Sequence, residues 1–155
     1  MKRVGVLIAA LAVVAACGQS PVTPAPTASP AATAAAQVPE VVRSRSNLPS
    51  CGVENATSQN GPWNAEGRSC FWNAYQKGQP AEFTSTRLTI EGDPITSIYR
   101  VLGPGKVEIF VDTTRDKFGA PGWTRLDCAT LAALQTIGTQ PDFGPDDSCT
   151  LTTVG

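Results

Sequence analysis

Residues 95–113, ITSIYRVLGPGKVEIFVDT, predict the central element of the fold. Two runs rich in β-branched and aromatic residues, 95–102 and 106–113, flank a Gly-Pro-Gly sequence. Such runs are typical of strands, and glycine and proline between them are typical of a tight turn. The stretch therefore predicts a β-hairpin, and the neighbouring elements are expected to build on it.

The turn also predicts which side chains share a face of the hairpin. If Leu102 lies opposite Lys106, successive cross-strand pairs fall on alternate faces. One face then carries the pairs Arg100–Glu108 and Ile98–Phe110. The other face is apolar and carries the pairs Tyr99–Ile109 and Val101–Val107. We expect a helix to cover this second face.

That helix is predicted over residues 65–77, because Asn64 is a favourable N-cap and Gly78 a favourable residue after the C-cap. Residues 82–91 predict a strand whose Leu88 and Ile90 join the apolar face.

Two further strands are predicted over 122–128 and 148–154, whereas 129–136 could form a short helix or a loop. The expected fold class is α+β: one helix packed on an antiparallel sheet of three to five strands, stapled by disulfides.

The four cysteines of this region are expected to form two disulfides, as is typical of small exported domains. They are Cys51, Cys70, Cys128 and Cys149. Three pairings are possible. Pairing of nearest neighbours is kinetically favoured and would stabilise by about 3 kcal/mol per bridge, but the crossed pairings stay open. Their wide spacing and the absence of histidine favour no metal site, and we expect no cofactor.

Residues 1–16 have the layout of an export signal, with Lys2 and Arg3 before an uncharged apolar run. The run is too short to cross a bilayer core of about 30 Å. Its ending, Val14-Ala15-Ala16-Cys17, resembles the lipobox of bacterial lipoproteins. The resemblance implies that Cys17 is lipidated and becomes the N-terminus of the mature chain. An ordinary secretory signal and a plain membrane anchor are the alternatives.

Residues 17–45 are expected to be the lipidated cysteine and a disordered tether, since most of this stretch is rich in Pro, Ala and Thr and offers little to bury. Residues 46–155 are then the folded domain. The expected location is the outer side of the cytoplasmic membrane, with the membrane as a partner through the lipid anchor. Without Lys2 and Arg3, 10 of the 12 basic side chains remain against 13 acidic ones, so nucleic acid is not an expected partner.

The sequence favours a non-catalytic domain over an enzyme. It has no histidine, which removes the commonest general base. The carboxylates at 91, 93, 112 and 116 flank turns, and we interpret Asp93 and Asp116 as turn formers. The expected function is a surface-tethered lipoprotein whose domain binds an envelope protein or polymer. The alternatives are an envelope structural protein and a small carboxylate-dependent hydrolase.

The candidate binding face is the sheet face turned away from the helix. Its residues are Arg87, Ile98, Arg100, Glu108 and Phe110. Apolar side chains rimmed by charge are typical of a contact site. The competing interpretation is that residues 129–143 fold over this face and make it a second core.

Residues 89–119, TIEGDPITSIYRVLGPGKVEIFVDTTRDKFG, with the Gly-Trp and Cys that follow, are similar to small exported actinobacterial lipoproteins of unknown function. The similarity spans about 80 residues, from Cys51 to Cys128. It implies an exported α+β domain and assigns no site residues.

Overall fold

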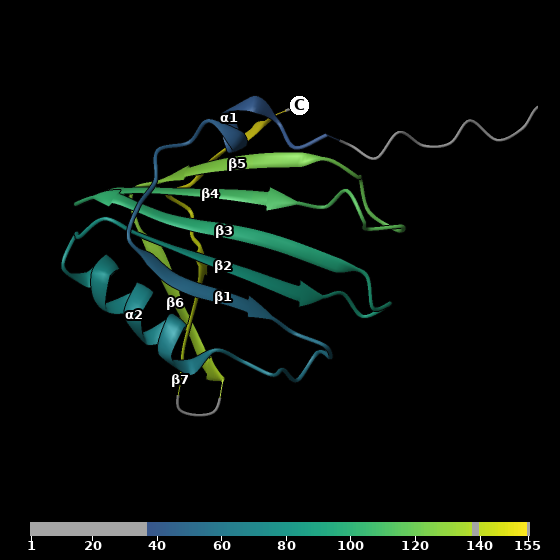
Figure 1. The fold of residues 1–155 in the computed structure, drawn as a ribbon, viewed down its shortest axis with the longest axis horizontal. Coiled ribbons are helices and arrows are strands. Elements are labelled where there is room, and N and C mark those ends of the chain that lie inside the picture. The colour runs from purple at the N-terminus through teal and green to yellow at the C-terminus, as the bar shows by residue number, and fades with distance from the viewer. Residues whose placement is uncertain (1–36, 138–139, 155) are drawn as a thin grey trace, which may run out of the picture. The chain divides into compact units, whose positions relative to one another are not determined.

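The computed structural model describes residues 37–137 and 140–154, so the predicted leader, Cys17 and most of the predicted tether lie outside the described residues. Within this part, a six-stranded sheet has the order β1-β2-β3-β4-β5-β8, and β6 and β7 form a separate hairpin (Figure 1). The elements are α1 (Glu40–Arg43), β1 (Ser50–Asn55), α2 (Ala65–Gln76), β2 (Ala81–Leu88), β3 (Pro94–Gly103), β4 (Lys106–Asp112), β5 (Trp123–Cys128), β6 (Leu131–Ile137), β7 (Gln140–Pro145) and β8 (Thr150–Thr153).

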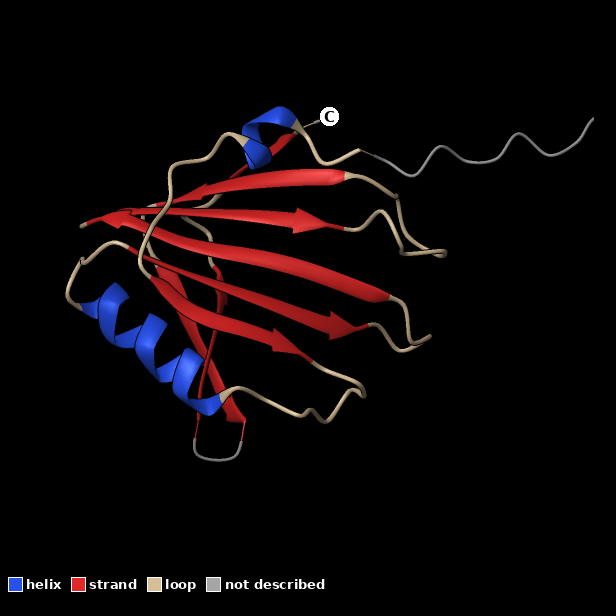
Figure 2. Ribbon diagram, in the orientation of Figure 1, coloured by secondary structure: helices blue, strands red, loops and turns tan. Residues whose placement is uncertain are grey.

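The α+β class is observed, with strand greatly exceeding helix (Figure 2). Helix α2 begins as predicted, because the Asn64 side chain accepts a hydrogen bond from the backbone N–H of Gly67 at 2.9 Å. The prediction of a purely antiparallel sheet of at most five strands is wrong. The strand that was not predicted is β1, at one edge of the sheet. It runs parallel to β2 and is joined to it through α2. Its sequence, SCGVEN, is short and interrupted at Gly52, whose φ of +99° accompanies a shift in register.

The β3–β4 hairpin has the predicted side-chain pairing along the strands. Arg100 lies opposite Glu108, and Ile98 lies opposite Phe110. Only the turn differs, because Gly103 rather than Leu102 pairs with Lys106, and an irregularity after Val101 takes up the extra residue. Gly105 in this turn has a φ of +63°, a conformation that glycine adopts without strain.

The predicted faces of β2 are reversed in the structure. Phe83 pairs with Tyr99, and both belong to the core that α2 covers. The odd-numbered residues of β2, Arg87 among them, therefore face α2. Leu88 lies on the opposite face, and Ile90 lies in the turn that follows, 88% exposed. The reason is the turn: Thr89 donates its backbone N–H to the Asp93 carbonyl at 2.8 Å, which sets the pairing of Leu88 with Pro94. A one-residue change in register moves every side chain to the other face.

The sheet has an apolar core on each side. On one face, α2 and the β6–β7 hairpin pack against β2, β3 and β4, with Phe71 of α2 centred 4.9 Å from the ring of Phe143. Residues 129–136 were predicted as a short helix or a loop, but most of them belong to the strand β6 (Leu131–Ile137). On the other face, a smaller core contains four buried residues: Val42, Ile98, Phe110 and Trp123.

Both disulfides join cysteines that are nearest neighbours among the four of the domain. Cys51–Cys70 links β1 to α2, and Cys128–Cys149 links the end of β5 to the segment before β8. This confirms the kinetically favoured pairing. The folded part begins earlier than the predicted boundary at residue 46, because Val42 of α1 is buried.

Candidate functional site

The predicted binding face does not lie in solvent. Phe110 is 1% exposed, and Ile98, Arg100 and Glu108 are also buried. The segment that covers them includes α1 rather than residues 129–143, which pack on the other side of the sheet. Arg87, the fifth predicted residue, is on that other side as well. The pattern correctly identified an apolar patch rimmed by charge, but the chain itself supplies the partner.

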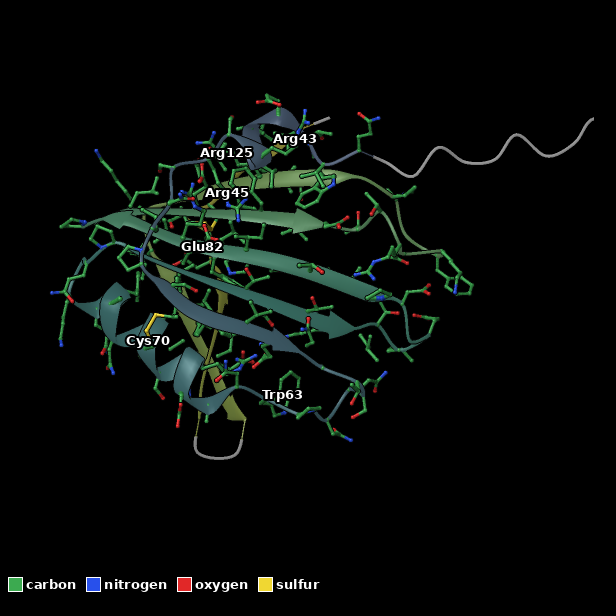
Figure 3. All side chains as sticks on the ribbon, viewed as in Figure 1. Arg43, Arg45, Trp63, Cys70, Glu82 and Arg125 are labelled. Atoms are coloured by element: carbon green, nitrogen blue, oxygen red, sulfur yellow. A yellow bond between two sulfur atoms is a disulfide. The ribbon has the colours of Figure 1, made fainter. Side chains whose placement is uncertain are left out.

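A chain of alternating charges fastens the covering segment to this face. Arg45 donates from Nη2 and Nε to the two carboxylate oxygens of Glu82, at 2.9 and 3.1 Å. Glu82 also accepts a hydrogen bond from Nε of Arg100 at 3.1 Å. Arg100 donates a further hydrogen bond from Nη2 to the backbone carbonyl of Ser46 at 2.6 Å. Arg100 and Glu108 form the next, buried pair. Arg125 of β5 pairs with Glu108 at 3.1 Å and ends the chain of charges. Figure 3 labels Arg45, Glu82 and Arg125 over the strands of the sheet. This network has a structural role, since its charges are paired with one another.

A second ionic network lies on the α2 side of the sheet. Arg68 of α2 donates to both oxygens of Glu54, at 2.7 and 2.6 Å, and to Asp142 at 3.0 Å. Asp142 also pairs with Arg87. The guanidinium carbons of Arg68 and Arg87 lie 5.1 and 5.5 Å from the ring of Trp63. Figure 3 labels Trp63 beside the end of β1. Two arginines and two carboxylates balance their charges in this cluster.

The protonation of Glu54 argues against a role as a general acid. Burial by itself raises the pKa of Glu54, but hydrogen bonds from Arg68, from the Asn64 backbone N–H and from Ser85 outweigh burial. The pKa of Glu54 therefore lies below its ordinary value of 4.5. A carboxylate that is ionised and fully engaged by donors has neither a proton nor a free oxygen to offer a substrate.

Three connecting segments meet at one end of the sheet, where β1, β2 and β4 end and β3 and β5 begin. We call this end the loop surface, and it comprises residues 57–63, 89–93 and 113–122. Gln59 donates to the Thr89 carbonyl at 3.2 Å. The two oxygens of Asp93 accept from the side chain and the backbone N–H of Lys117, at 2.9 and 3.0 Å. Each segment is therefore bonded to its neighbour.

The carboxylates of the loop surface hold its backbone in place. The Lys117 ammonium, and after it the Lys117 backbone N–H, lower the pKa of Asp93 below its ordinary value. Asp116 accepts from the backbone N–H groups of Phe118 and Gly119, both at 3.0 Å. Asp112 accepts in the same way from Thr114 at 2.9 Å. The interpretation of Asp116 as a turn former is confirmed, and Asp93 proves to bridge two loops.

The loop surface displays two large apolar side chains to solvent. Ile90 is 88% exposed and Phe118 is 75% exposed. Both belong to turns closed by hydrogen bonds. Thr89 donates its backbone N–H to the Asp93 carbonyl across the turn of Ile90, and Asp116 accepts from the backbone N–H groups of Phe118 and Gly119. Exposed apolar side chains held on such turns are candidates for a contact site. Ile90 was predicted to join the core and is exposed instead, and Phe118 was not predicted as a site residue. The turn-forming aspartates beside both residues, Asp93 and Asp116, are the sequence signal for these exposed turns.

The chain matches no protein-family model, no curated protein and no solved structure. Among residues 37–137 and 140–154, no helix has both the length and the apolar character required to span a bilayer. The same residues contain no cluster of three or more side chains suited to holding a metal ion.

Proposed function

We propose that this chain is an exported, lipid-anchored protein whose domain is not catalytic and makes its contacts through the loop surface. The observation that carries the proposal is the exposure of Ile90 and Phe118 on turns that are hydrogen-bonded to each other. Exposed apolar groups rimmed by charged ones mark contact sites. The lipobox-like ending at Cys17 supports the anchored location.

The charge pairing of the buried carboxylates supports a non-catalytic role. Glu54, Glu108 and Asp142 are bound by arginines, and Asp93 is bound by Lys117. Glycoside hydrolysis by carboxylates requires two of them to face a substrate, one as an acid with a raised pKa. Here the pKa values of Glu54 and Asp93 both lie below the ordinary values of these groups.

A photo-crosslinking amino acid at position 118 tests the proposal in living cells. We expect p-benzoylphenylalanine in place of Phe118 to form cross-links upon irradiation, because the side chain at this position is held at the contact. Leu102 is the matched control, since it is 41% exposed and lies near the end of β3, beside the hairpin turn at the opposite end of the sheet. Equal cross-linking at 102 and 118 would contradict the proposal and favour a structural role for the anchor and tether alone.

A further inference from the structure

We infer that the loop surface docks on the lipid surface to which the chain is anchored, with the side chains of Ile90 and Phe118 entering the interface. The inference rests on the proposed anchoring through Cys17.

The described chain enters the domain from the side of the loop surface. Val42 packs with Trp123, the first residue of β5 and the one that directly follows the loop 113–122. The chain then runs away from this end, because Arg45 binds Glu82 and Ser46 binds Arg100 further along the strands. In Figure 1, the dark blue start of the described chain accordingly lies toward the ends of the strands that carry these loops.

The segment between Cys17 and the described chain is short enough to keep the loop surface near the anchor. About 20 residues separate Cys17 from residue 37. As a flexible coil, such a segment has a root-mean-square length of roughly 25 Å, and as extended polyproline it spans at most about 60 Å. Because the described chain begins beside the loop surface, anchoring through Cys17 favours contact of this surface with the membrane over contact of the opposite end of the sheet.

Two protruding side chains suit a lipid interface better than a protein partner. A stable protein interface needs about 1,000 Å² of complementary surface, which requires a contiguous patch. Ile90 and Phe118 are only two side chains, on two turns that are joined through Asp93 and Lys117. Lipid adapts to isolated apolar groups, and the exposed Glu91, Arg115 and Lys117 beside them can remain among the headgroups. Because these charges have both signs, docking is expected to need no anionic lipid.

Depth-dependent quenching in the anchored protein tests this orientation. The acylated chain is reconstituted in phosphatidylcholine vesicles that contain nitroxide-labelled lipid, and a fluorophore is attached to a single new cysteine. Glu91→Cys places the fluorophore beside Ile90, and Lys106→Cys places it in the turn at the opposite end of the sheet. Both positions are exposed, and the four other cysteines of the domain are disulfide-bonded.

We expect strong quenching at position 91 and little at position 106. Adding Ile90→Ser and Phe118→Ser should reduce the quenching at 91 to the level at 106, while the protein still floats with the vesicles. Replacing part of the phosphatidylcholine by phosphatidylglycerol should change neither value. Equal quenching at both positions, or quenching at 91 only with phosphatidylglycerol, would overturn the inference.

The outcomes separate this inference from the proposed function. Cross-linking of position 118 to one discrete protein, without quenching at 91, would overturn the lipid contact and leave the proposed contact surface standing. A chain that is not acylated and does not float with vesicles would instead overturn the anchoring on which both depend. Cross-linking of position 118 to lipid together with quenching at 91 would support both.

Discussion

Replacing Phe110 by alanine tests whether the sheet face beneath α1 is a core or a binding surface. Phe110 is 1% exposed and belongs to the small core formed with Val42, Ile98 and Trp123. Truncating a buried phenylalanine to alanine costs about 3–5 kcal/mol, because transfer free energy is lost and a cavity remains. For a domain of this size, a loss of 1 kcal/mol lowers the melting temperature by about 4 °C. We therefore expect Phe110→Ala to lower it by roughly 12–20 °C.

The chain offers a matched control in Phe118, which is 75% exposed. The same change at this position should alter the free energy of unfolding by no more than about 0.5 kcal/mol. Urea denaturation followed by circular dichroism, with the disulfides intact, gives the free energy of unfolding of both variants, and a thermal melt gives their melting temperatures. A small and similar loss for the two variants would refute the assignment of Phe110 to a core and would restore this face as a candidate binding surface.

Four further predictions concern the anchor, the disulfides and the buried ions. Cys17→Ser should abolish membrane retention and processing, as detergent partitioning of cells would show; normal retention would contradict lipidation. Alkylation of the unreduced domain should add no mass, and reduction should expose four thiols, whereas one persistent free thiol would contradict the two bridges. Arg68→Met should destabilise the domain by about 3–5 kcal/mol in urea, because Glu54 is left buried and unpaired. Folding lowers the pKa of Glu54, so the ionised carboxylate stabilises the domain above pH 4.5, and this stabilisation is lost as the pH falls through the folded-state pKa. Glu54→Gln should therefore reduce the loss of unfolding free energy that acid causes, as urea denaturation at a series of pH values would show.

The local pattern of residues 95–113 determined the hairpin and the pairs that share its faces. Alternation along a strand is a property of the backbone, and a short turn with glycine and proline leaves little freedom in register. The pairs Arg100–Glu108 and Ile98–Phe110 are therefore found as predicted. The N-cap at Asn64 and the nearest-neighbour disulfides were predictable for the same reason, since both depend on residues close in sequence.

What covers each face was decided only by the tertiary structure. Alternation identifies the side chains that share a face, but it carries no information on which distant segment packs there. Val42 lies within residues 17–45, which were predicted to be a tether, and Phe143 comes from a stretch without a clear period. The faces of β2 depended on a turn whose closing hydrogen bonds, from Thr89 to Asp93, cannot be read from residue types alone. The exposure of Ile90 follows from those same bonds, and that of Phe118 from the bonds that Asp116 accepts from the backbone N–H groups of residues 118 and 119. The aspartates were visible in the sequence, but the joining of the two turns into one surface depends on the folded chain.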